Sequence, residues 1–245
     1  MTTSFNEQFD QLGAWRREFA LRLKLLSEWM KDNELLDAAV EERLRRLGTQ
    51  VRSDKVMVAF VAEFSRGKSE MINAVFFAGY GRRIMPASAG RTTMCPTEMG
   101  YDAEVPPCLR LLPIESRLQP QALMEWRMVP EKWTRIDLDV NNPQQLASAL
   151  EKVAETRKVT QDEARALGFW HSQAPEDNPM VDAQGMVEVP KWRHALINIA
   201  HPLLKQGLVI LDTPGLNAIG AEPELTVSLI PQAHAVVFIW APIPA

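Results

Sequence analysis

The chain has 245 residues and a formal net charge of −4, with 46% hydrophobic and 24% charged residues. That length can bury a sizeable core, as one large domain or one domain with an appendage, and the composition is ordinary for a soluble fold. The acidic balance argues against general nucleic-acid binding, which needs a basic face. Two cysteines, Cys95 and Cys108, are too few for a disulfide framework, so we expect buried, reduced thiols and a cytoplasmic location. No signal peptide opens the chain, and no apolar run approaches the roughly 20 residues that span a membrane.

Residues 1–50 are predicted to form an amphipathic helix or a helical hairpin, because apolar residues recur at spacings of three and four. Asp32 and Asn33 suggest a break, and Gly48 is expected to end the second helical stretch. One broken helix and a hairpin fit equally well. The apolar positions are Phe9, Leu12, Trp15, Phe19, Leu23, Leu26 and Met30, then Leu36, Val40, Leu44 and Leu47.

A strand, a loop and a helix follow in the order that a phosphate-binding P-loop requires. The apolar run 56–61 leads into the loop 62–69, and residues 70–77 have a helical pattern. Gly67 lets the backbone approach a phosphate, and the helix N-terminus then faces the anion. We expect phosphate contacts from Glu63, Phe64, Ser65, Arg66, Gly67, Lys68, Ser69 and Glu70.

A second element lies far downstream, where the apolar run 207–211 ends in Asp212-Thr-Pro-Gly215. An aspartate at a strand end beside a phosphate loop can hold Mg²⁺ through water, and the glycine N–H can bind a γ-phosphate. The combination predicts a nucleotide site. Each part also has a plainer interpretation: Asp212 could cap a turn, Thr92 and Thr93 could begin a strand, and the first loop position, usually glycine, is Ala62.

Together, residues 63–69, the threonine-rich segment 87–97 and residues 211–216 resemble the GTPase domain of bacterial dynamin-like proteins. The resemblance covers roughly residues 50–240. It implies that Lys68 contacts the phosphates, that Ser69 ligates Mg²⁺, and that Ser65 helps neutralise charge between the β- and γ-phosphates. Phe64 replaces a residue that is often glutamine in eukaryotic relatives.

The same resemblance makes Thr93 the switch I threonine, whose hydroxyl completes the Mg²⁺ shell and whose carbonyl orients water. Thr92 is the rival, one position away. Asp212 and Gly215 become the switch II contacts to the metal and to the γ-phosphate. Since Leu216 stands where a catalytic glutamine could follow, the resemblance implies self-association across the nucleotide face to complete the site. Membrane remodelling at lipid is the family's usual outcome.

The part after residue 232 is expected to hold one more strand, 235–240, with an exposed apolar edge. We find no Asn/Thr-Lys-x-Asp motif to read guanine, so we expect the chain to be a fragment of a longer protein, with weak nucleotide binding and little turnover by itself. Sequence past residue 245 would test whether the chain is a fragment. A helical stretch is predicted at 224–232.

The centre of the chain is predicted to be an insertion at about 115–190 within a GTPase domain of residues 51–245. Strand 108–114, helix 143–157 and a short helix starting at Thr160 and running to Leu167 are expected, with a loop at 171–184. The histidines (His171, His194, His201, His234) lack metal-site spacing. We expect Trp126, Trp133, Trp170 and Trp192 to pack rather than to face a partner.

The predicted fold is therefore α/β: a largely parallel P-loop NTPase sheet with flanking helices, plus an N-terminal helical segment. The predicted activity is GTP hydrolysis with Mg²⁺, in the cytoplasm or at the membrane periphery. Two alternatives stay open, another P-loop ATPase or kinase and a non-catalytic nucleotide-binding scaffold.

Overall fold

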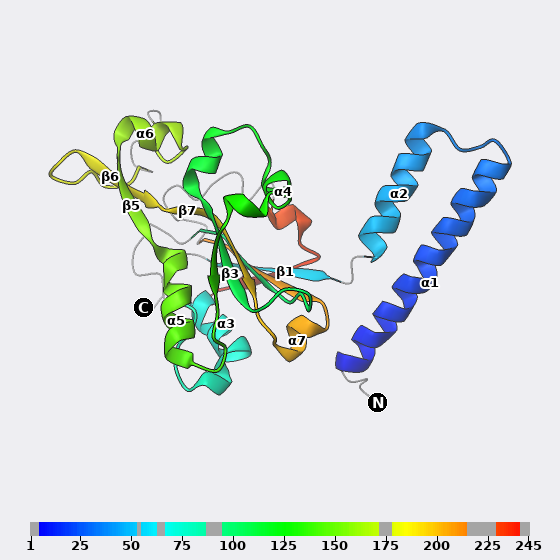
Figure 1. Ribbon diagram of the computed structural model, residues 1–245, viewed down its shortest axis with the longest axis horizontal. Coiled ribbons are helices and arrows are strands. Elements are labelled where there is room, and N and C mark those ends of the chain that lie inside the picture. Colours follow the sequence, from blue (N-terminus) through cyan, green and yellow to red (C-terminus); the bar gives the residue numbers. More distant parts are fainter. Residues whose placement is uncertain are drawn as a thin grey trace. The chain divides into compact units, whose positions relative to one another are not determined.

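The computed structural model describes residues 5–52, 55–62, 67–86, 95–171, 178–214 and 229–240. The chain divides into two compact units, Met1–Val56 and Met57–Ala245. Figure 1 shows the first as a pair of helices and the second as a sheet with helices around it. Among the described helices, none combines the length and the apolar character that crossing a membrane would require.

The first unit is a helical hairpin, which decides between the two forms that the sequence allowed. Helix α1 (Phe5–Asp32) and helix α2 (Ala38–Arg52) pack against each other. The break falls at Asp32 and Asn33, as predicted, and Asn33 Nδ2 donates to the carbonyl of Trp29 at 2.8 Å. The prediction that Gly48 ends the second helix is wrong, because α2 continues to Arg52.

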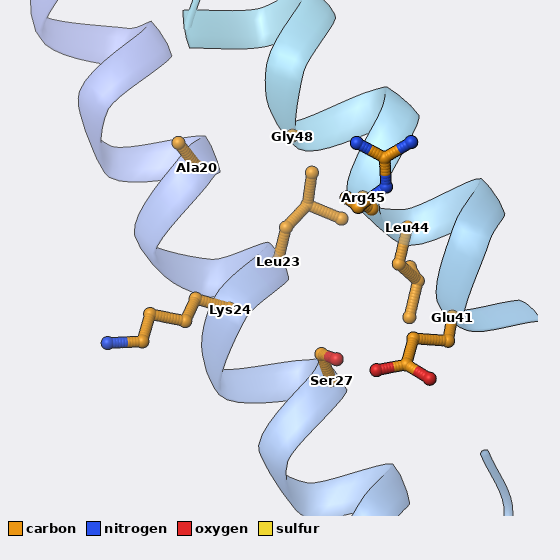
Figure 2. A pocket seen from close by; sticks show the side chains of 8 residues that line it. All are labelled: Ala20, Leu23, Lys24, Ser27, Glu41, Leu44, Arg45 and Gly48. Atoms are coloured by element: carbon orange, nitrogen blue, oxygen red, sulfur yellow. The ribbon is translucent and has the colours of Figure 1, made fainter.

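Gly48 instead lies on the inner side of α2, beside a hollow of about 270 Å³ between the two helices (Figure 2). Small side chains such as Ala20 and Ser27 face it from α1, so the helices leave space between them. A Cβ built on Gly48 would meet no atom within 4 Å. The packing therefore does not require glycine at this position, and glycine favours helix formation less than alanine does. The hollow is lined by Ala20, Leu23, Lys24, Ser27, Glu41, Leu44, Arg45 and Gly48.

Replacing Gly48 by alanine should stabilise the hairpin by about 0.5–1 kcal/mol, because alanine loses less backbone entropy in a helix and no atom obstructs its methyl group. Thermal unfolding followed by circular dichroism would measure this gain. Gly185→Ala is the control. Its Cβ would also have free space, but Gly185 has a φ of +77° and its replacement should destabilise the protein. A loss of stability in Gly48→Ala would contradict the packing described here.

The second unit is built on a sheet of seven described strands in the order β4-β3-β7-β2-β8-β1-β9. Pairs β1·β9 and β2·β7 are parallel, whereas β2·β8, β3·β7 and β3·β4 are antiparallel. The sheet is thus mixed rather than largely parallel. Strands β7 and β8 lie on either side of β2 and run antiparallel to each other, and the connection between them, residues 199–207, is shorter than a crossover to a parallel strand needs. The strands are β1 (Val56–Ala62), β2 (Thr97–Gly100), β3 (Cys108–Pro113), β4 (Thr134–Asp137), β7 (Trp192–Asn198), β8 (Leu208–Asp212) and β9 (Ala235–Ile239).

Helices cover both faces of this sheet, as the fold class α/β requires. Ile72 and Phe76 of α3 and Leu150 of α5 join the main core on one face, together with α7. Trp126 of α4 and Trp133 pack on the other face. In Figure 1, α3 and α5 lie together on one side of the sheet. The helices are α3 (Lys68–Phe76), α4 (Leu123–Trp126), α5 (Pro143–Glu151) and α7 (Pro202–Lys205).

A second, two-stranded sheet pairs β5 (Thr156–Thr160) with β6 (Met186–Pro190), and α6 (Gln161–Ala166) packs on it over a small core of its own. The predicted start of α6 is confirmed, since the Thr160 hydroxyl accepts a hydrogen bond from the N–H of Glu163. The predicted helix 143–157 is too long. After Glu151 the chain makes a 3-10 turn, Lys152–Ala154, and enters β5.

The predicted last strand is confirmed as β9, which pairs with β1 at the edge of the sheet. Its Val236 and Phe238 are exposed, as expected of an apolar edge. Residues 224–228 of the helix predicted at 224–232 lie outside the described residues, and Ile230–Gln232 is a 3-10 helix. The cysteines Cys95 and Cys108 are free and buried, and burial raises the pKa of each thiol.

The large aromatics of the central region pack, as predicted. Trp133 Nε1 donates to the carbonyl of Trp126 at 2.9 Å, and Trp192 Nε1 donates to the carbonyl of Lys152 at 2.8 Å. His194 lies beside Trp133, with the two rings edge to face at 6.3 Å, and it is fully buried on β7. Neither of its ring nitrogens has a hydrogen-bond partner among the described residues. Burial, with Arg127 and Arg193 acting in the same direction and Glu98 opposing them, lowers the pKa of His194 from 6.5 to about 3.

This buried histidine predicts acid sensitivity. Between pH 6.5 and about 3 the unfolded chain binds a proton at His194 that the folded chain does not, so the free energy of unfolding falls as pH falls through that window. Lowering the pH from 7 to 5 should reduce the free energy of unfolding by roughly 2 kcal/mol through His194. Urea unfolding at both pH values should show a smaller loss for His194→Leu than for the wild type. His171→Gln, at an exposed position, is the control, and equal losses in all three proteins would contradict this account.

Candidate functional site

The two predicted nucleotide elements meet where two neighbouring strands of the sheet, β1 and β8, end. Strands β1 and β8 are neighbours, and the hydroxyl of Thr213, just beyond β8, donates to the carbonyl of Phe60 near the end of β1 at 2.9 Å. The carboxyl ends of both strands are therefore side by side. Ala62 ends β1, and Asp212 ends β8. Ser69, at the start of α3, and Asp212, at the end of β8, are 143 positions apart in the sequence but lie in the same region of the fold.

Lys68 and Asp212 form an ion pair in this region, with Nζ and Oδ1 separated by 2.7 Å. The Lys68 side chain is 11% exposed and the Asp212 side chain 3%. Two opposite charges removed from water in this way depend on each other, because either one alone would be an uncompensated buried charge. The contact joins the P-loop lysine directly to the aspartate of the downstream motif.

Gly67 forms the entrance to α3 and has the left-handed conformation, with φ 84° and ψ 12°. Gly67 has no side chain to cap the helix, and no cap from a described residue takes its place, so within the described part of the chain the first-turn N–H groups have no capping acceptor. Such a terminus suits an anion, since the free N–H groups and the helix dipole both favour negative charge. Lys68 and Ser69 are the first two residues of this helix.

The residues present also fit Mg²⁺. Apart from the ion pair with Lys68, neither carboxylate oxygen of Asp212 accepts a hydrogen bond from a described residue. A buried carboxylate with unused acceptor capacity is suited to a cation. Mg²⁺ prefers oxygen ligands and is commonly held by one or two carboxylates together with phosphates and water. Within the described ranges no group of three or more His, Cys, Asp or Glu gathers as an all-protein metal cage, and this magnesium arrangement does not need one.

Several predicted site residues lie outside the described part of the chain: Glu63, Phe64, Ser65, Arg66, Thr92, Thr93 and Gly215. Their roles stay predictions. Of the described ones, the structure brings Lys68 and Asp212 together and places Gly67 and Ser69 at the same helix start. Glu70 is exposed and forms an ion pair with Arg83, so its place at a phosphate gains no support from these contacts.

Two residues of this region were missed by sequence reasoning. Thr213 ties the end of β8 to β1, and Asn73 on α3 is buried and hydrogen-bonded to the segment that follows the helix. The signal for Asn73 was its place in the otherwise apolar middle of α3, four residues after Ser69. A polar residue there needs buried partners.

The geometry defines a P-loop nucleotide-binding protein: a strand, a glycine turn and a helix N-terminus, with an acidic strand end beside them. The family model described as "Dynamin family" matches residues 58–242. This chain belongs to the dynamin family.

A curated relative, a bacterial dynamin-like protein of Nostoc punctiforme, is 23% identical over an alignment 255 residues long, which covers 97% of this chain and 29% of the relative. The chain therefore spans less than a third of that relative's length. Two solved structures of an oligomerised bacterial dynamin pair, described in terms of long-range sensing and tethering of membranes, match with TM-scores of 0.38 and 0.39. They share 20% and 13% identity and cover 82% and 94% of this chain, and 23% and 28% of theirs.

Removing one member of the buried ion pair should destabilise the fold. Lys68→Met leaves the Asp212 carboxylate buried without its cation, and we expect a loss of roughly 3–5 kcal/mol in the free energy of unfolding. Adding Asp212→Asn should recover part of that loss, which urea unfolding of the single and double variants would measure as a coupling energy.

Lys158→Met is the matched control. Lys158 also pairs with an aspartate, Asp182, at 2.7 Å, but its side chain is 62% exposed, so little change is expected. Additive losses in the double variant would show that Lys68 and Asp212 do not interact in solution.

Proposed function

We propose that this chain binds GTP with Mg²⁺ and, within its full-length gene product, hydrolyses it. The observation that carries the proposal is the contact of Lys68 with Asp212, because it joins the P-loop and the Asp-x-x-Gly element of a dynamin-family chain at a single sheet edge. The start of α3, whose geometry suits an anion, and the acidic strand end beside it support the proposal.

In this proposal each residue holds or orients one part of the nucleotide. Lys68 reaches the β- and γ-phosphates, while the first-turn N–H groups of α3 donate to phosphate oxygens. Ser69 and Asp212 hold Mg²⁺, with Thr93, or Thr92 in its place, completing the shell. Mg²⁺ would supply neutralisation of the charge that develops on the phosphates. Ser65 and Gly215 would contact the β- and γ-phosphates.

Membership of the dynamin family supports a proposal about assembly and target. We propose self-association through the nucleotide face and a peripheral membrane role for the full-length product. Since Leu216 stands where a catalytic glutamine could follow Gly215, a partner subunit would complete the site. We propose no nucleic-acid partner.

The test uses the full-length gene product with anionic lipid vesicles. A fluorescent GTP analogue should bind and be displaced by excess GTP but not by excess ATP, and phosphate release should fall by about 100-fold or more in Lys68→Ala, since the lysine offsets charge in the transition state. Equal displacement by ATP would favour the other P-loop ATPase or kinase.

The control variant is Lys158→Ala, which also removes a lysine from an aspartate pair but lies on β5 of the smaller sheet. Its rate should match that of the wild type. Binding without phosphate release above the Lys68→Ala level would end the enzymatic claim and leave a nucleotide-binding scaffold.

A further inference from the structure

Asn73 occupies a buried position on the helix that carries the proposed phosphate and magnesium residues. Its side chain is 8% exposed on α3, four residues after Ser69. An asparagine side chain can donate two hydrogen bonds and accept two. Here all four are made, and every partner is a backbone group.

The four bonds join two places in the chain. Nδ2 donates to the carbonyl of Ser69 at 2.9 Å, in the first turn of α3, and to the carbonyl of Met85 at 3.0 Å. Oδ1 accepts from the N–H groups of Ile84 and Met85 at 2.9 Å and 2.8 Å. Ile84 and Met85 are themselves buried to 1% exposure. One side chain thus fixes the segment after α3 against the first turn of the same helix.

The fixed segment leads directly into residues 87–94, which contain Thr92 and Thr93. The chain returns at Pro96, whose carbonyl accepts from the N–H of Ala195 on β7, and Thr97 then pairs with Asp212 across β2 and β8. Both ends of the threonine segment are therefore held by described residues. The exit is held by the sheet, and the entrance is held by Asn73, with an exposed ion pair between Arg83 and Glu70 beside it.

We propose that Asn73 is a positioning residue for nucleotide hydrolysis. It sets the distance between the first turn of α3, where Lys68 and Ser69 lie, and Ile84 and Met85, which precede the segment that carries the proposed magnesium ligands Thr92 and Thr93. This inference rests on the proposed GTPase function, and it adds a residue that touches neither nucleotide nor metal. Loss of Asn73 should leave diphosphate binding, which depends on α3 and its N-terminus, but impair the step that needs the threonine.

The chain offers a matched control in Asn198. It is also 8% exposed. Its Oδ1 accepts from the N–H of Asp102 at 2.7 Å, and its Nδ2 donates to the carbonyls of Val105 at 2.6 Å and Asp102 at 3.1 Å, with the Pro106 carbonyl at 3.4 Å sharing one of these two hydrogens. Asn198 and Asp212 lie at opposite ends of β2. Asn198 of β7 pairs with Gly100, the last residue of β2, whereas Asp212 of β8 pairs with Thr97, the first. Truncating Asn198 therefore removes an equivalent buried amide far from the proposed site.

The experiment compares Asn73→Ala and Asn198→Ala in the full-length gene product. We expect similar losses of thermal stability. In Asn73→Ala alone, kcat for GTP should fall by roughly 10- to 100-fold and the Mg²⁺ concentration for half-maximal rate should rise, because a small misplacement of a catalytic group is costly. Affinity for GDP should stay within about 3-fold of the wild type, since its contacts are made by α3. Equal loss of kcat in the two variants, or none in Asn73→Ala, would overturn the proposal.

Hydrogen exchange provides a readout that does not depend on turnover. The amides of Ile84 and Met85 should exchange faster in Asn73→Ala than in Asn198→Ala, because both lose the acceptor of their N–H groups. If the wild type neither binds nor hydrolyses GTP, the proposed function fails, and equal exchange in the two variants would then also reject the positioning role. Should the alanine variants not fold, Asn73→Ser and Asn198→Ser replace them as a pair.

Discussion

The buried contact between Lys68 and Asp212 is the constraint on which the site depends. Either charge alone there would destabilise the fold, so the ion pair favours structures in which the end of β8 and the start of α3 lie together. The sheet order makes this possible by placing β8 beside β1, and the bond from Thr213 to Phe60 fixes their ends. One electrostatic requirement therefore links fold stability to the geometry that would receive a phosphate chain.

The strands and helix that carry the described site residues are separate from the strands that extend the domain. The β1, β8 and α3 group carries the described site residues, whereas β3 and β4 extend the sheet away from them on the far side of β7. The smaller sheet of β5 and β6 has its own core around Phe169 and Val187. Because that core packs separately, sequence change there need not disturb the strand ends at Asp212. This arrangement explains how a long stretch can lie between two motifs that act together.

Much of the site could be predicted from the sequence, because its signals are local. The apolar runs before Ala62 and Asp212 have the length and composition of buried strands, and Gly67 indicates the turn that a helix start requires. The contacts that could not be predicted are those set by tertiary packing. Nothing near Asn73 in the sequence indicates that Ile84 would be its partner, and Gly48 looked like a helix end because local propensity does not include its position facing α1.

The tryptophans of the protein differ widely in their exposure to solvent, so their fluorescence should differ as well. Trp15 and Trp29 of α1 and Trp240 after β9 are more than half exposed, whereas Trp126 and Trp133 on the sheet are almost wholly enclosed. Indole emission shifts to longer wavelength in water, and a dissolved quencher such as acrylamide reaches only the solvated rings. The fluorescence of the folded protein should therefore include a component that acrylamide quenches readily, from Trp15, Trp29 and Trp240, and a protected component from Trp126 and Trp133. A change at either place can then be followed without attaching a dye.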